Sequence, residues 1–416
     1  MTHYNPVNEP VLSYAPGSVE RSALQAALTS QLGQAVEIPA VIGGSRVFGE
    51  DTDPLVCPHD HRHTLGRVQR TSAGDIGAAI AACESAHRDW SRQSFDERAA
   101  IFLRAADLLA GPWRQKLNAA TMLGQSKTVQ QAEIDSACEL IDFLRFNVAF
   151  AQRLHDMQPF SPPGMRNTQD YRPLEGFVYA VTPFNFTAIG GNLACAPALM
   201  GNTVIWKPAG SAALSNYFVL ELLEAAGLPA GVINFVPGDP ILISDTVLAA
   251  SSLAGIHFTG STDVFDLLWR STAERLASYR SYPRLVGETG GKNFVLAHAS
   301  ADPAALSVAL LRGAFEYQGQ KCSAASRAYI PASIWPEVKQ RLLDNLATLT
   351  MGDVAELSHF MGAVIDRRAF ERIKGYLDRT RNDGSSMLLA GGGCDDRIGY
   401  FVEPTEIGRA SCRERV

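Results

Sequence analysis

Short apolar runs alternate with helical patterns from Gly176 onward, and this alternation constrains the fold more than any other feature of the sequence. The runs are four to six residues long. Runs of this kind, separated by helices, are typical of parallel strands buried on both faces. We therefore expect a doubly wound α/β protein with a Rossmann-like parallel sheet. The predicted strands lie in GFVYAVTP, TVIWKP, VINFVPG, GIHFTGS, PRLVGE and NFVLAHA.

The residues before this region predict helices after an irregular beginning. The first 60 or so residues are proline-rich, and we expect them to be irregular. Ser94 and Glu97 have the spacing of a capping box, and Gly111 should end the helix that they begin. A second helix is expected over residues 128–150. Its predicted apolar face consists of Ile134, Ala137, Ile141 and Leu144.

Charge and cysteine content exclude several classes of protein. The net charge of −6 and pI of about 5.9 argue against a nucleic-acid partner or an anionic membrane surface. No apolar run reaches the roughly 18 residues of a membrane span, and no leader peptide is visible at the N-terminus. The seven cysteines lack a CxxC pair, which argues against a disulfide framework or a metal site. They favour a reducing compartment, and we expect the cytoplasm.

Two residues could carry chemistry, although neither is decisive by itself. Cys322 lies in EYQGQKCSAASR, where a turn and the neighbouring Lys321 could favour a reactive thiolate. For that segment alone, a buried and inert cysteine is the better interpretation. Glu288 lies in VGETGGKN beside a Gly-Gly turn, where a carboxylate is usually a solvated loop residue.

Five ordered motifs change this interpretation: TPFNF, IWKPAG, FTGS, GETGGKN and GQKCSA. Their order and spacing resemble the aldehyde dehydrogenase superfamily. Longer segments, such as PLEGFVYAVTPFNFTAIGGNLACAPALMGN, are similar to the stand-alone 1-pyrroline-5-carboxylate dehydrogenase branch. The resemblance covers residues 8–406. It implies an enzyme of proline degradation that oxidises glutamate semialdehyde, the open form of 1-pyrroline-5-carboxylate, to glutamate with NAD.

The resemblance also implies catalytic roles. Cys322 would be the nucleophile that forms a thiohemiacetal and then a thioester. The side-chain amide of Asn185 and the backbone N–H of Cys322 would hold the oxyanion. Glu288 would activate the water that hydrolyses the thioester.

The cofactor contacts are implied by the same resemblance, since the usual G-x-G-x-x-G motif is absent. Gly260 and Ser261 would face the pyrophosphate at a helix N-terminus, where N–H groups favour anions. Gly210 stands where many NAD-preferring relatives have a glutamate, which leaves NADP possible. The implied cofactor residues are Thr182, Pro183, Lys207, Gly260 and Ser261.

Three further residues are implied to bind the substrate. Ser323 would contact the substrate carboxylate, and Phe186 would pack on the aliphatic chain. Glu133 resembles an acidic residue near the site, while a solvated helix glutamate is an equally open interpretation.

The domain organisation follows from the same comparison of motifs. We expect an NAD-binding domain over residues 1–286, with an oligomerisation arm near 156–173, and an incomplete catalytic domain over 287–406. Residues 407–416, with Cys412, are expected to be a translated sequencing adapter. The intact protein would be a homodimer or a higher oligomer. Two alternatives remain open: a dehydrogenase for another semialdehyde, such as succinate semialdehyde, and a non-catalytic NAD-binding or interaction fragment.

Overall fold

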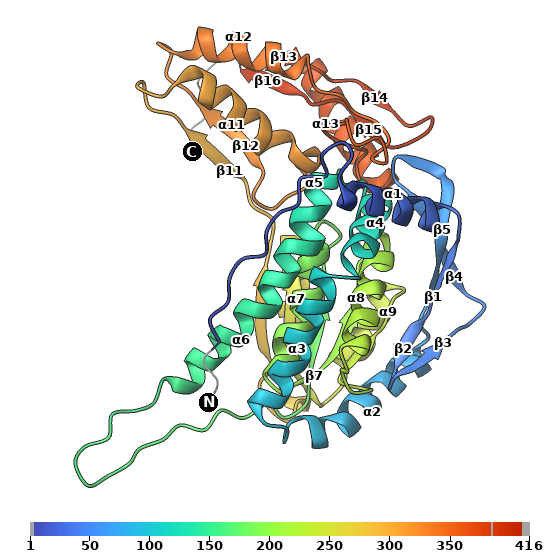
Figure 1. Cartoon of the computed structure of the whole chain (residues 1–416), viewed down its shortest axis with the longest axis vertical. Coiled ribbons are helices and arrows are strands. Elements are labelled where there is room, and N and C mark those ends of the chain that lie inside the picture. Colours follow the sequence, from blue (N-terminus) through green and yellow to red (C-terminus); the bar gives the residue numbers. More distant parts are fainter. Residues whose placement is uncertain (1–3, 384–385, 410–416) are drawn as a thin grey trace. The chain divides into compact units, whose positions relative to one another are not determined.

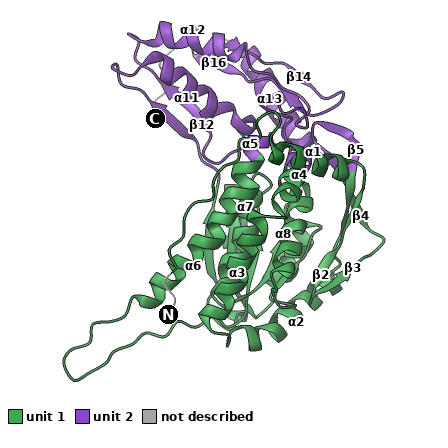
Figure 2. Ribbon diagram, in the orientation of Figure 1, with its two compact units in different colours: residues 1–55, 65–121, 132–289 green, residues 56–64, 122–131, 290–416 purple. Residues whose placement is uncertain are grey.

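The computed structural model describes residues 4–383 and 386–409, and the chain divides into two compact units (Figures 1 and 2). Unit 1 comprises residues 1–55, 65–121 and 132–289; unit 2 comprises residues 56–64, 122–131 and 290–416. The sequence predicted a single domain boundary after residue 286. It did not anticipate that residues 56–64 and 122–131 belong to unit 2. Residues 410–416 of the predicted adapter segment, including Cys412, lie outside the described residues.

Unit 1 is built on a seven-stranded sheet in the order β10-β9-β6-β7-β8-β2-β3. The five strands from β10 to β8 are parallel, which confirms the doubly wound α/β expectation. The sheet is nevertheless mixed, because the pairings of β2 with β8 and with β3 are antiparallel. Its strands are β2 (Ala40–Ile42), β3 (Ser45–Val47), β6 (Phe177–Val181), β7 (Thr203–Lys207), β8 (Ile233–Phe235), β9 (Leu253–Thr259) and β10 (Arg284–Glu288).

Helices cover both faces of this sheet, as right-handed crossovers require when the strand order reverses between β8 and β9. One face packs against α2, α9 and α10 through buried side chains such as Ile76, Val247 and Leu268. Helix α7 contacts β6, β7 and β9 as well as α3, α6 and α8. These helices are α2 (Ala73–Trp90), α3 (Phe95–Ala110), α6 (Leu140–Asp156), α7 (Thr187–Leu199), α8 (Ala213–Ala225), α9 (Pro240–Leu248) and α10 (Thr262–Glu274). Helix α4 (Arg114–Gln125) follows α3 in the chain.

The N-terminal region differs in part from the prediction. The capping box is confirmed: the Ser94 Oγ accepts from the Glu97 N–H at 3.3 Å, and the Glu97 carboxylate accepts from the Ser94 N–H at 2.8 Å. The expectation of an irregular beginning is wrong after residue 18, because a helix and several strands follow. Three of the six prolines in the first 60 residues precede this helix, and Pro54 lies within β4. Those elements include α1 (Val19–Leu32), β1 (Val36–Ile38), β4 (Thr52–Cys57) and β5 (Asp60–Gln69).

The helix expected over residues 128–150 contains a π-helical segment. The chain forms α5 (Val129–Ala132), a π-helix (Glu133–Glu139) and α6 (Leu140–Asp156). A π-helical turn adds a residue and shifts the phase of the side chains around the helix. Ala137, Ile141 and Leu144 are buried as predicted, but the prediction for Ile134 is wrong, since it is 39% exposed.

Unit 2 contains the remaining helices and three small sheets. Two of its helices, α11 and α12, share a core that includes Leu310, Leu311, Val338 and Leu342. The elements are β11 (Asn293–Leu296), α11 (Pro303–Phe315), β12 (Ala325–Tyr329), α12 (Trp335–Leu346), α13 (Arg367–Asn382), β13 (Ser386–Ala390), β14 (Cys394–Asp395), β15 (Phe401–Val402) and β16 (Glu406–Arg409).

A long loop follows α6 and projects away from the sheet of unit 1 (Figure 1). Its two sides are joined where the Gln169 N–H donates to the Gln158 side chain at 2.8 Å. Phe160 and Met165 near its tip are 83% and 61% exposed. Within the described part of the chain, no helix has both the length and the apolar character needed to span a membrane.

Candidate active site

Four of the predicted segments meet at one edge of the unit 1 sheet. Strands β6, β7, β9 and β10 are parallel, so their carboxyl ends lie on the same side, where ligands of open α/β sheets bind. The Gly260 N–H after β9 donates to the Glu288 carbonyl at the end of β10, at 3.1 Å. The Thr182 N–H after β6 donates to the Lys207 carbonyl at the end of β7, at 3.2 Å. We call this edge the carboxyl edge.

Asn185 and Phe186 lie in the loop between β6 and α7, and a buried carboxylate anchors this loop. The Asp135 side chain accepts from the N–H groups of Thr187 and Ala188, at 3.0 and 2.9 Å. It therefore caps the N-terminus of α7 directly after Asn185. Asp135 is 1% exposed. The sequence analysis missed this residue, because the capping carboxylate comes from the π-helix, more than fifty residues earlier.

Lys207 and Thr182 form the part of the carboxyl edge that would hold the adenosine side of the cofactor. Burial lowers the pKa of the Lys207 ammonium to about 8, although the charge of Asp239 opposes the change. The Trp206 indole N–H donates to the Thr182 hydroxyl at 3.0 Å and fixes that side chain. Thr182 and Pro183 are both buried. A cation held in this way suits the polar oxygens of a dinucleotide.

Gly260 and Ser261 join β9 to α10. The Ser261 hydroxyl accepts from the Val264 N–H at 3.4 Å and is the N-cap of α10. A Cβ at Gly260 would lie 2.7 Å from the ring of Phe258, so the packing requires glycine there. A helix N-terminus preceded by glycine lets a phosphate approach the backbone N–H groups. These residues therefore fit the pyrophosphate of a dinucleotide.

Glu288 is the exposed last residue of β10, where it pairs with Thr259 of β9. Gly287 before it packs under an aromatic ring, because a Cβ there would lie 2.2 Å from Phe265. The carboxylate thus follows a closely packed strand end and shares the carboxyl edge with Asn185, Lys207 and Ser261.

Cys322 lies in unit 2, in a turn between a 3₁₀ segment (Glu316–Gly319) and β12. The Ala324 N–H donates to the Lys321 carbonyl at 3.1 Å and closes the turn. The Asn293 side-chain amide donates to the Cys322 carbonyl at 2.6 Å. A Cβ at Gly291 would lie 3.1 Å from the same carbonyl. The second half of the GETGGKN motif therefore packs against the Cys322 turn.

Exposure separates Cys322 from most of the other described cysteines. It is half-buried, as is Cys394. Burial raises the pKa of the thiols of four other cysteines to about 12, which suits inert core residues. These four are Cys57, Cys83, Cys138 and Cys195. Ser323, next to Cys322, is exposed.

Glu133 is the predicted site residue whose surroundings argue for a structural role. It is 0% exposed. Its carboxylate accepts from the Leu12 N–H at 2.8 Å, the Tyr14 hydroxyl at 2.7 Å and the Asn118 amide at 2.9 Å, and it also binds Arg114 through two guanidinium nitrogens. The Cys138 thiol also donates to it at 3.6 Å, and a carboxylate that accepts six hydrogen bonds from the protein has little capacity left for a substrate. The structure therefore favours a structural glutamate, although a buried one rather than the solvated one considered from the sequence.

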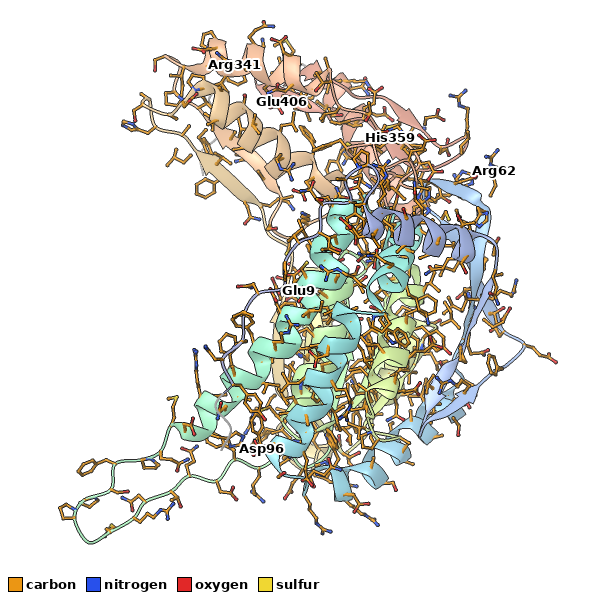
Figure 3. The ribbon with its side chains drawn as sticks, viewed as in Figure 1. Glu9, Arg62, Asp96, Arg341, His359 and Glu406 are labelled. Carbon is orange, nitrogen blue, oxygen red and sulfur yellow. The ribbon has the colours of Figure 1, made fainter. Side chains whose placement is uncertain are left out.

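The N-terminal segment is tied to this group through a second acid. Glu9 accepts from Arg114 at 2.6 Å and from Arg145 of α6 at 2.8 Å. Figure 3 shows Glu9 on the N-terminal segment alongside α6. We call these three residues, Glu133, Arg114 and Glu9, the Arg114 cluster. The cluster binds residues 9–14 to the helices behind the carboxyl edge.

Comparison with known proteins finds a matching family and several similar enzymes. Residues 49–410 match the aldehyde dehydrogenase family. The human mitochondrial delta-1-pyrroline-5-carboxylate dehydrogenase is 50% identical over 398 residues, which are 95% of this chain and 71% of that protein. The crystal structure of the Mycobacterium tuberculosis enzyme of the same name, bound with NAD, has a TM-score of 0.96 and 55% identity, covering 98% of this chain and 76% of that one. A Thermus 1-pyrroline-5-carboxylate dehydrogenase with bound NAD has a TM-score of 0.91 and 28% identity, with 98% and 78% covered.

Proposed function

The chain belongs to the aldehyde dehydrogenase family, and we propose that it oxidises glutamate semialdehyde, the open form of 1-pyrroline-5-carboxylate, to glutamate with NAD. The observation that carries this proposal is the similarity to enzymes named for that substrate, 50% and 55% identical over almost the whole chain. The chemistry of the residues supports it independently. A half-buried thiol, a strand-end carboxylate and a side-chain amide are the groups that aldehyde oxidation requires.

In the proposed mechanism, the Cys322 sulfur attacks the aldehyde carbon, and the carbonyl oxygen becomes an oxyanion. The Asn185 amide and the Cys322 N–H donate hydrogen bonds to this oxyanion, and each such donor contributes roughly 3–4 kcal/mol. NAD, held by the residues of the carboxyl edge, would supply the acceptor for the hydride of this carbon. The resulting thioester is hydrolysed by a water molecule whose proton passes to the Glu288 carboxylate. The products would be glutamate, the reduced cofactor and the regenerated Cys322 thiol.

The cofactor would be held at the carboxyl edge. Lys207 would contact the adenosine ribose, and Gly260 and Ser261 would bind the pyrophosphate. Thr182 and Pro183 would line the slot. Gly210 has no heavy atom within 4 Å of an added Cβ, so the position beside Lys207 is open. An open position accommodates a ribose with or without a 2′-phosphate. Measured affinities for NAD and NADP would show which of the two cofactors is preferred.

Ser323 and Phe186 are the proposed substrate contacts. Ser323 would donate to the substrate carboxylate and Phe186 would pack on its methylene groups. The carboxylate of succinate semialdehyde is one carbon nearer to the aldehyde than that of glutamate semialdehyde. A Ser323 that binds the carboxylate while Cys322 attacks the aldehyde should therefore prefer glutamate semialdehyde.

A cytoplasmic location and a homodimer or higher oligomer are further proposals. The location rests on the cysteine pattern, which suits a reducing compartment. The oligomer rests on the loop between α6 and β6, where large apolar side chains such as Phe160 are 83% exposed. Sedimentation analysis of wild type and Phe160→Ser tests it, and an unchanged mass would contradict a role for this loop.

The catalytic proposal is tested by NADH formation with 1-pyrroline-5-carboxylate and with succinate semialdehyde. We expect Cys322→Ala to abolish NADH formation, while Cys394→Ala, which removes the other half-buried thiol of unit 2, retains it. The rate with 1-pyrroline-5-carboxylate should be the higher one. NAD binding without turnover of either aldehyde would contradict the proposal and leave a non-catalytic NAD-binding protein.

A further inference from the structure

Three residues with a left-handed backbone conformation lie near the Cys322 turn. Among the described residues other than glycine, φ is positive at Tyr14, Ser126, Tyr317 and Gln318, with values from 51° to 55°. The last three belong to unit 2 and contact one another. The Tyr317 hydroxyl donates to the Gln125 carbonyl at 2.9 Å, and the Gln318 amide donates to the Ser126 carbonyl at 3.2 Å. Bulky side chains rarely adopt this backbone conformation, and it persists where the surroundings determine it.

The Gln318 side chain joins three segments of the chain. Its amide nitrogen donates to the Ala363 carbonyl at 2.5 Å as well as to the Ser126 carbonyl. The Ser126 hydroxyl in turn accepts from the Ala363 N–H at 2.9 Å. The segments lie so close that a Cβ at Gly362 would be 2.4 Å from the Ser126 hydroxyl. Residues 126, 318 and 362–363 therefore form one interlocked group, which we call the Gln318 tie.

The Gln318 tie leads directly into the turn that carries the thiol. Gln318 precedes Cys322 by 322 − 318 = 4 residues. The Gln320 N–H donates to the Tyr317 carbonyl at 2.9 Å. The Gln320 side chain accepts from the Ile365 N–H at 3.0 Å, which fixes the chain again two residues before Cys322. The kink at 317–318 thus sets the direction in which the chain enters the Cys322 turn.

We propose that Gln318 is a positioning residue for the nucleophile: its amide holds the left-handed kink, and the kink holds the Cys322 turn. The inference rests on the proposed role of Cys322. A primary amide has two N–H donors, so one nitrogen can bind two carbonyls at once. A carboxylate in its place has no donor and would repel both carbonyl oxygens. Nucleophilic attack depends steeply on geometry, and a displacement of about 1 Å can lower the rate by about 100-fold.

The test compares Gln318→Glu with Gln340→Glu, a matched change on the exposed face of α12, where the Gln340 amide donates to the Asp344 carboxylate at 2.8 Å. We expect Gln318→Glu to lower the rate of the first hydride-transfer burst at least about tenfold. The KM for NAD should stay within about twofold, because the cofactor residues belong to unit 1. Gln340→Glu should match wild type in both. An unchanged burst in a folded Gln318→Glu variant would overturn the inference.

A second variant covers the case in which Gln318→Glu does not fold. Glycine adopts positive φ without strain, so Gln318→Gly keeps the backbone conformation and removes only the tie. We expect it to fold, with a thermal midpoint lowered by the two lost hydrogen bonds, and to show the same loss of burst rate. A full burst in Gln318→Gly would mean that the amide is dispensable and would refute the inference. Absence of a burst in wild type would instead refute the proposed function, so the two failures are distinguishable.

Discussion

Replacing Glu133 by alanine should destabilise the protein strongly, because it removes the acceptor of six hydrogen bonds inside unit 1. Arg114, which is 4% exposed, would lose its closer partner and remain buried. Removing one member of a buried ion pair typically costs about 3–5 kcal/mol. Arg114 keeps its 2.6 Å contact with Glu9, so part of its charge stays compensated. We therefore expect the lower end of that range, a loss of about 3 kcal/mol in the free energy of unfolding.

Urea unfolding followed by tryptophan fluorescence measures this loss. The matched control is Glu274→Ala, an exposed glutamate at the end of α10, which should change the free energy by less than about 0.5 kcal/mol. Adding Arg114→Met to Glu133→Ala should cost less than the sum of the single changes, because the uncompensated charge is gone. If Glu133→Ala unfolds like wild type but raises the KM for the semialdehyde, Glu133 binds substrate and the structural interpretation is refuted.

The pH dependence gives an independent check on Glu133. Burial acts to raise its pKa, but hydrogen bonds from Arg114, Leu12 and Tyr14 outweigh burial and hold the pKa below its usual value. A carboxylate with a lowered pKa in the folded state stabilises the protein above its unfolded pKa of about 4.3, and this stabilisation is lost as the pH falls through the folded pKa. Wild type should therefore lose more stability than Glu133→Ala as the pH falls below about 4.3. Equal losses would contradict the argument.

Three further predictions concern the carboxyl edge. Asn185→Ala should lower kcat by about 10²–10³-fold, because it removes a hydrogen-bond donor to the oxyanion. Steady-state kinetics measures this loss, and an unaltered Kd for NAD would support the role of Asn185 in catalysis. NAD should bind less tightly as the pH rises through about 8, where Lys207 loses its charge, and calorimetry should show this dependence in wild type but not in Lys207→Met. Asp135→Ala leaves two N–H groups of α7 without their buried acceptor, so the free energy of unfolding should fall by at least about 2 kcal/mol; a midpoint equal to that of wild type would show that water replaces the carboxylate.

The sequence was sufficient to predict the carboxyl edge because its signals are local. An apolar run that ends in Thr182, Lys207 or Gly260 identifies both a strand and its carboxyl end, and parallel pairing brings those ends together. The buried carboxylates that stabilise the segments behind the carboxyl edge could not be predicted in this way. Glu133 and Asp135 are buried in a π-helical segment, and their hydrogen-bond partners are as distant in sequence as Leu12 and Thr187.

The backbone conformation before the Cys322 turn could not be predicted from local sequence either. In EYQGQKC, local preference assigns positive φ to Gly319, and the structure has it there at 68°. It also has positive φ at Tyr317 and Gln318, which local preference disfavours. Hydrogen bonds to residues 125–126 and 363, which are remote in sequence, offset that preference. The residues on either side of Cys322 are therefore not sufficient to predict this backbone conformation. Disagreement between local preference and observed backbone is therefore itself a signal, because such strain persists where the fold maintains a geometry that function needs. Here it leads to Gln318, which no catalytic motif of the sequence had singled out.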